Sequence, residues 1–352
     1  MNYRGAVYTW LITGCVMVLM MVVVGGITRL TQSGLSMVRW EPIIGTLPPL
    51  TEEKWQQEFE AYQATPEYKV YNNHFSLDDF KGIYFWEYVH RLLGRIVGLV
   101  FLIPAIFFWR KGAFDGRMKK QVVIIFFGGL FQGVLGWYMV KSGLVDRPHV
   151  SHFRLAAHLS TALALAAYIF WVSLEWKPFK QIHAPEIRKW SIGLLVVLGI
   201  QIVYGAFVAG LKAGKMYNTF PKMGRTWFPN EITTAFDIHG WMAVIENGIP
   251  IQLIHRYLAY LVVGMVVWVA WSIYKKHKGL QPAALLLVAL VTVQFLLGVF
   301  TLLYAVPVSL GVLHQLGAVF LLLGVIYLIK KTSRVTGNKA TKPAEATQAL
   351  AY

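Results

Sequence analysis

The sequence predicts an all-α integral membrane protein in which eight transmembrane helices form two pseudo-symmetric four-helix bundles. Of its 352 residues 56% are hydrophobic, and eight apolar segments reach the roughly 20 residues that a helix needs to cross a bilayer core. An internal repeat of motifs predicts the two bundles. The apolar segments cover residues 7–27, 83–109, 121–140, 151–174, 190–210, 249–273, 281–304 and 307–329.

The two halves of the chain carry matching motifs on matching segments. The pairs, N-terminal half first, are Glu87-Tyr-Val-His90-Arg91 with Gln252-Leu-Ile-His255-Arg256, Gln132-x-x-x-Gly136 with Gln294-x-x-x-Gly298, and His158 with His314. An even number of helices in each half predicts parallel repeats, related by an axis along the membrane normal. We therefore expect an N-terminal half over 1–175, a C-terminal half over 176–331, and a disordered polar tail over 332–352.

The net charge of +16 is distributed as membrane topology predicts, which argues against nucleic-acid binding. With the N-terminus inside, 18 lysines and arginines fall on the inner side and 11 on the outer side, where the loop 28–82 carries eight acidic residues. This bias places both termini in the cytoplasm. The chain enters its first apolar segment without a transit peptide, so we expect a bacterial cytoplasmic membrane. The single cysteine, Cys15, excludes disulfides and thiolate metal sites.

The loop 28–82 contains two distinctive stretches. Residues 25–37 are rich in glycine and hydroxyl side chains and are followed by several prolines. We expect this stretch to cover the outer side of a site in the N-terminal half of the chain. Residues 55–71 are amphipathic and predict a surface helix.

Four histidines are the candidate metal ligands. Each follows the predicted start of an inward-running helix by six or seven residues, about 10 Å deep, and they are His90, His158, His255 and His314. Ionisable residues inside a membrane indicate a functional site. Two imidazoles on facing helices suit the two axial positions of a haem. Zinc or copper would need a third or fourth donor, and only Glu87 is close in sequence.

The halves differ at one position with chemical consequences. Glu87 lies one helical turn before His90, whereas Gln252 occupies the matching place before His255. Because only one of the two sites has a carboxylate, we predict proton chemistry at that site. The other site is then expected to hold a cofactor and pass electrons. The alternative is that Glu87 simply pairs with Arg91 or Arg95. Arg91 and Arg256 are candidate partners of haem propionates, or anchors at the membrane interface.

Long motifs resemble the haem A synthase family, of the type found in mitochondria and related bacteria. They are Gly26-Ile-Thr-Arg-Leu-Thr-Gln-Ser-Gly-Leu-Ser-Met37 with Trp40 and Pro48-Pro49, Trp55 with Pro66-Glu67-Tyr68-Lys69, and Glu87-Tyr-Val-His90-Arg91-x-x-Gly94-Arg95. The resemblance spans nearly all of residues 5–330. Other family members carry a cysteine pair in the first outer loop, and residues 28–82 here have none. A thiol-based step is therefore not available to this chain.

The resemblance implies an oxidoreductase that converts the C8 methyl of haem O to a formyl group by successive hydroxylations. By position, His90 and His158 would ligate the iron of the substrate haem, and Glu87 would lie near its reacting edge as a base or as a stabiliser of developing positive charge. His255 and His314 would ligate a permanent haem b. The topology predicted above places the four histidines, and with them the haem sites, near the outer face of the membrane.

The implied partners are haem O, membrane lipid, an electron acceptor that the sequence does not identify, haem O synthase and oxidase assembly factors. The oxygen source and a homo-oligomeric state stay open. Two rival functions remain. One is a di-haem b-type electron-transfer cytochrome without substrate turnover, and the other is a transporter, which the duplicated halves would also suit. The Gln-x-x-x-Gly motifs favour close helix packing over the broken helices of a transporter.

Overall fold

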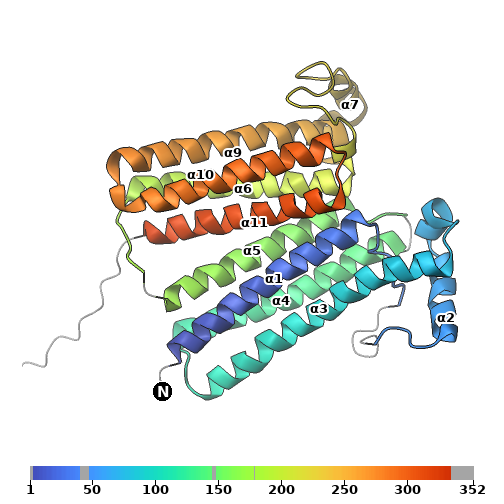
Figure 1. Cartoon of the computed structure of the whole chain (residues 1–352), viewed down its shortest axis with the longest axis horizontal. Helices are drawn as coiled ribbons and strands as arrows, with labels where there is room; N and C mark the ends of the chain where they lie inside the picture. The colour runs from blue at the N-terminus through green and yellow to red at the C-terminus, as the bar shows by residue number, and fades with distance from the viewer. Residues whose placement is uncertain (1–2, 40–46, 145–147, 178, 334–352) are drawn as a thin grey trace, which may run out of the picture.

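Eight helices are long and apolar enough to cross a membrane in the described part of the chain, residues 3–39, 47–144, 148–177 and 179–333 of a computed structural model (Figure 1). This confirms the predicted helices. They are α1 (Arg4–Leu30), α3 (Leu77–Arg110), α4 (Gly116–Leu144), α5 (His152–Trp176), α6 (Pro185–Gly210), α9 (Gly248–Lys276), α10 (Gln281–Leu303) and α11 (Val308–Lys331). Trp40 and the tail 334–352, both included in the sequence predictions, lie outside the described residues.

The helices pack in two groups of four that follow chain order. Helices α1, α3, α4 and α5 contact one another, as do α6, α9, α10 and α11, and Figure 1 shows the two groups side by side. Contacts of α5 with α6, and of α11 with α1 and α5, join the groups. The largest buried cluster of apolar side chains extends across this junction, from Val22 and Leu163 to Val325. Pseudo-symmetry between the groups stays a prediction.

The four histidines all lie toward the same end of these helices, which we call the histidine end. His158, His255 and His314 follow the first residues of α5, α9 and α11 by six or seven positions, as predicted. For His90 that count is wrong, because α3 begins at Leu77. A capping box formed by Ser76 and Asp79 starts the helix early, in a polar stretch that hydropathy alone does not include.

The predicted surface helix over 55–71 is interrupted in the structure. Helix α2 (Glu52–Gln63) is capped by Thr51 and ends before Pro66, and a short π-helix, η2 (Tyr68–Asn72), follows. The Thr65 hydroxyl donates to the carbonyl of Tyr62 at 2.7 Å, and Pro66 has no N–H to continue the ladder. The result is a compact cap in which the rings of Tyr62 and Phe80 stack at 5.2 Å.

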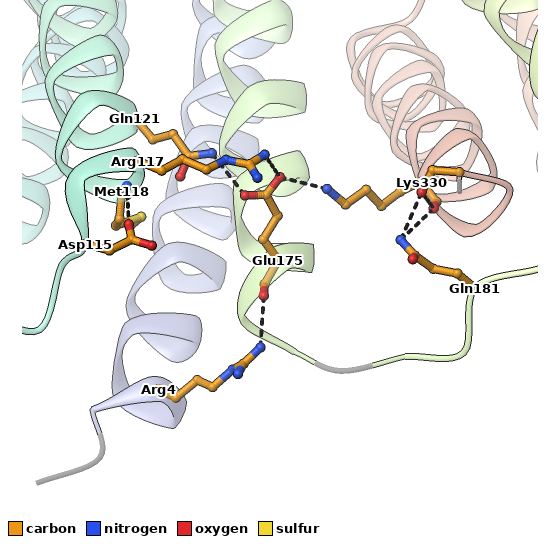
Figure 2. A network of polar contacts seen from close by, with 9 residues as sticks. Arg4, Asp115, Arg117, Met118, Gln121, Glu175, Gln181 and Lys330 are labelled. Carbon is orange, nitrogen blue, oxygen red and sulfur yellow. Dashed lines mark hydrogen bonds and ion pairs between the residues drawn. The ribbon is translucent and has the colours of Figure 1, made fainter. Parts of the chain in front are cut away.

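The ends opposite the histidines are joined by an ionic network centred on Glu175, near the end of α5 (Figure 2). The carboxylate accepts hydrogen bonds from Arg117 of α4 at 2.6 Å and from Lys330 of α11 at 2.8 Å. Its main-chain carbonyl accepts from Arg4 of α1 at 3.2 Å. One residue therefore holds three other helices, and one of these belongs to the C-terminal group.

Four further helices occupy the connection between α6 and α9. They are η3 (Ala213–Lys215), α7 (Glu231–His239), η4 (Gly240–Met242) and α8 (Ala243–Glu246), and α7 projects beyond the histidine end of α9 in Figure 1.

Candidate functional site

The structure brings His255 of α9 and His314 of α11 together. Their ring centroids are 6.4 Å apart, and the ring planes are inclined at 87°. An imidazole nitrogen ligates a transition metal at about 2.0–2.1 Å, and the ring centre lies about 1.2 Å behind that nitrogen, so two rings on opposite sides of one metal have centres about 6.4–6.6 Å apart. At the observed spacing, His255 and His314 would be able to hold a single iron between them.

Each histidine lies against a glycine of another helix. A Cβ atom added to Gly205 of α6 would lie 3.1 Å from Cε1 of His255, and one added to Gly298 of α10 would lie 2.8 Å from Cε1 of His314. The N-terminal group repeats the arrangement, with 3.2 Å from Gly25 of α1 to His90 Nε2 and 3.4 Å from Gly136 of α4 to His158 Cε1. The missing side chains leave space for the rings.

Three of these glycines belong to Gln-x-x-x-Gly motifs, and the glutamines contact the same histidines. Gln294 Nε2 lies 3.2 Å from Nδ1 of His314, which leaves Nε2 of that ring for a metal. In the amide orientation that satisfies both ends of its side chain, Gln132 Nε2 donates to His158 Nδ1 at 3.2 Å. Gln201 donates to the main-chain carbonyl of His255 at 3.1 Å. The sequence predicted close helix packing from these motifs and did not predict their contacts with the histidines, which lie on other helices.

A cavity of about 350 Å³ opens beside the C-terminal histidine pair, lined by His255, His314, Gly205, Gly298, Gln252 and Arg256, among other residues. Most of its wall is apolar. Seven residues that line this cavity have a buried polar side-chain atom without a hydrogen-bond partner among the described residues, and Gln252 Oε1 and Arg256 Nε are two of these atoms. A wide apolar cavity with two opposed imidazoles and unused polar atoms is what a haem with polar edge groups requires.

The donor set disfavours the zinc or copper alternative. Among the described residues, no group of three or more His, Cys, Asp or Glu side chains could hold a metal ion. A structural zinc site needs four ligands and a catalytic one needs three. The paired histidines therefore fit a haem iron, whose macrocycle supplies the other four donors.

In the N-terminal group, His90 and His158 lie close enough to interact electrostatically. One turn from His90, the buried carboxylate of Glu87 accepts three short hydrogen bonds. They come from Arg91 Nη2 at 2.6 Å, from the Ser36 hydroxyl at 2.8 Å and from the Met37 N–H at 2.8 Å. The ion pair with Arg91 is the alternative role for Glu87, and it exists. The other two donors belong to the loop that was predicted to cover this site, so the loop fixes the carboxylate in one orientation.

Arg91 and Arg256 play matching structural roles. Arg91 Nη2 donates to the Met37 carbonyl at 2.9 Å, and Arg256 Nη2 donates to the Tyr217 carbonyl at 2.8 Å. Gln252 donates to the same Tyr217 carbonyl at 3.1 Å. Each half therefore ties the loop above its site to the helix that carries the first histidine. The propionate role of both arginines stays a prediction.

Comparison with known proteins places the chain in a family. Residues 8–326 match the family model described as cytochrome oxidase assembly protein. The chain belongs to that family. Haem A synthases of Flavobacterium psychrophilum and Flavobacterium johnsoniae are each 44% identical to it, over 95% and 94% of this chain and 100% and 98% of their own lengths. The haem A synthase of Maricaulis maris is 41% identical over 91% of this chain and 94% of its own.

Membership of the cytochrome oxidase assembly family agrees with the architecture. Relatives of bacterial origin match almost end to end, and the eight apolar helices identify a multi-pass membrane protein. The match covers both groups of helices, so both histidine pairs lie within the shared region.

Proposed function

We propose that this protein is a haem A synthase, an oxidoreductase that converts the C8 methyl group of haem O to a formyl group for the supply of haem A to terminal oxidases. The N-terminal half, residues 1–175, binds haem O as substrate, with His90 and His158 as the iron ligands. The C-terminal half, residues 176–331, holds haem b between His255 and His314. The names of the relatives support the reaction, and the site geometry supports the assignment of the two halves.

The observation that carries the proposal is the single carboxylate beside one of two histidine pairs. Glu87 and Gln252 occupy corresponding helix positions, both are 2% exposed, and both are held by the loop above them. The amide can only hold that loop, whereas the carboxylate can also take up a proton or stabilise positive charge at the substrate. The half with Glu87 is therefore the catalytic one.

Haem b supplies one-electron redox chemistry when it is bound. The chain's own contribution there is binding and orientation. Gln294 fixes the ring of His314, and Gly205 and Gly298 leave room for the two imidazoles. Arg256 lines the same cavity and has an unused Nε, so this side chain is the candidate partner of a polar edge group.

We further propose that the protein lies in the bacterial cytoplasmic membrane with both termini in the cytoplasm and with the histidine end at the outer face. The lysine and arginine bias between loops supports this orientation. A lipid-embedded site suits haem O, whose isoprenoid chain is apolar and stays in the bilayer while the macrocycle enters between helices.

Pigment analysis tests the proposal. The full-length protein and its Glu87→Gln and His255→Ala variants are expressed with a haem O synthase, and the extracted haems are identified by mass. We expect haem A in the wild type, loss of haem A with retained haem b in Glu87→Gln, and loss of haem b in His255→Ala. Glu60→Gln, at an exposed position of α2, is the matched control and should behave as wild type.

Haem b alone in every sample, with spectra unchanged by Glu87→Gln, would replace the synthase by the rival di-haem electron-transfer cytochrome. The ion pair between Glu87 and Arg91 is the observation that this rival can use, since it gives the carboxylate a structural role.

A further inference from the structure

A second buried carboxylate, Glu67, lies in the cap above the N-terminal site. Its residue is 6% exposed, and it belongs to the turn between α2 and η2. The carboxylate accepts a hydrogen bond from the hydroxyl of Tyr62 at 3.2 Å, and Asn72 donates to that same hydroxyl at 2.7 Å. Neither contact neutralises its charge. A carboxylate removed from water without an adjacent cation is costly, and such groups concentrate at functional sites.

Titratable groups from four elements interact with Glu67. Glu87 of α3 adds a second negative charge, whereas Arg29 of α1 and Lys212 of the segment after α6 are positive, and Tyr62 contributes its hydroxyl from α2. Burial raises the pKa of Glu67 to about 7, and the charge of Glu87 adds to this rise. The Tyr62 hydrogen bond, Lys212 and Arg29 act in the opposite direction without cancelling it. Glu67 therefore changes charge near neutral pH.

The two cations lie at the junction of the two halves. Arg29 donates to the carbonyls of Ala209 and Gly210 at the end of α6, and Lys212 donates to Gln32 at 2.6 Å. Both side chains also line the cavity beside the C-terminal histidine pair. Tyr62, which donates to Glu67, packs in one buried cluster with Met37, whose N–H donates to Glu87, so this cluster connects the surroundings of the two carboxylates.

We propose that Glu67 accepts protons from Glu87 during substrate oxidation. It then releases these protons to the water beyond the histidine end. This role rests on the proposed function, because the protons come from the oxidised methyl group. In the transfer itself, protonated Glu87 and ionised Glu67 become ionised Glu87 and protonated Glu67. One proton moves, no electron moves, and the total charge is unchanged.

Electrostatics favours this exchange. Two carboxylates that repel each other do not ionise independently, so a proton gained by one is lost more easily from the other. A proton acceptor is most effective when its pKa lies near the working pH. Arg29 and Lys212 stabilise the ionised form that must exist before each transfer.

Infrared titration of the purified full-length protein tests the carboxyl pair without any turnover. We expect the carbonyl band of a buried protonated carboxyl to disappear with a midpoint near pH 7, to be absent in Glu67→Gln, and to persist in the Glu60→Gln control. In Glu87→Gln the midpoint should fall, since the repelling charge is gone. A band that survives Glu67→Gln, or a midpoint that Glu87→Gln leaves unchanged, would overturn the coupling.

The rate of haem A formation at different pH values tests the relay. Glu67 accepts protons only when ionised, so its contribution grows as the pH rises through about 7. We expect Glu67→Gln to lose about tenfold or more of the rate above that pH and to flatten the profile, with partial recovery in Glu67→Asp. An equal loss at every pH, without recovery in the aspartate variant, would show a structural role instead. Absence of haem A in the wild type would refute the proposed function and leave the infrared result standing.

Discussion

Replacing Gly298 by alanine should reduce haem binding more than the same replacement at any of the other three glycines that contact the histidines. The added Cβ would lie 2.8 Å from Cε1 of His314, whereas carbon atoms in contact normally lie about 3.5–4.0 Å apart. The ring must therefore move by about 0.7 Å or more. Metal ligands tolerate departures of about 0.2 Å, so this displacement takes His314 out of its ligating position.

The four glycines give a graded series. The corresponding distances are 3.1 Å at Gly205, 3.2 Å at Gly25 and 3.4 Å at Gly136, where contact is nearly ordinary. Overpacking of this kind costs about 1–3 kcal/mol, and we place Gly298→Ala at the upper end and Gly136→Ala near zero. Such a loss weakens haem binding by about 5- to 160-fold.

The assay is the haem-to-protein ratio of purified variants, combined with their thermal unfolding. Gly264→Ala of α9 and Gly133→Ala of α4 are matched controls, because nothing lies within 4 Å of an added Cβ at either position. Alanine should leave these helices unharmed or stabilise them by about 0.5–1 kcal/mol. Equal haem content in Gly298→Ala and Gly264→Ala would refute the role of Gly298 in leaving room for His314, as would a greater loss at Gly136 than at Gly298.

Three further outcomes are expected. Glu175→Gln should lower the thermal unfolding temperature of the full-length protein, because Lys330 keeps its charge and loses its partner. The expected loss of stability is about 1.5–3 kcal/mol, and an unchanged temperature would show that water replaces the ion pair. Gln294→Leu should shift the midpoint potential of the C-terminal haem, because the ring of its ligand loses the contact at Nδ1, and an unshifted potential would contradict that role. A membrane-impermeant maleimide applied to intact spheroplasts should label Glu53→Cys and not Lys278→Cys, and the reverse pattern would show the opposite topology. The single native cysteine is buried and should not react.

Hydropathy was sufficient to predict the spanning helices because long apolar segments are stable in the bilayer core. It failed at the start of α3, where a capping box formed by Ser76 and Asp79 adds polar turns, and at Pro66, where a missing N–H ends a helix that the amphipathic pattern would continue. Both features depend on individual side chains rather than on the apolar character of a whole segment.

The sequence predicted the candidate ligands of the site, but not the side chains that hold these ligands in position. The sequence locates four histidines by helix position, and the structure adds what each ring rests against. The contact between Gln294 and His314 joins different helices, so spacing along the chain does not reveal it. The same holds for the donation from Ser36 to Glu87, which closes a loop of about 50 residues.

The ionic network around Glu175 has a mechanical consequence. Glu175 lies 17 positions after His158 on α5, a distance of about 26 Å along the helix axis. An ion pair therefore joins the two halves at the end opposite the histidines, and the hydrogen bonds from Arg29 to Ala209 and Gly210 join them again at the histidine end. The halves are held at both ends of their helices, so any movement that separates them must break both sets of contacts.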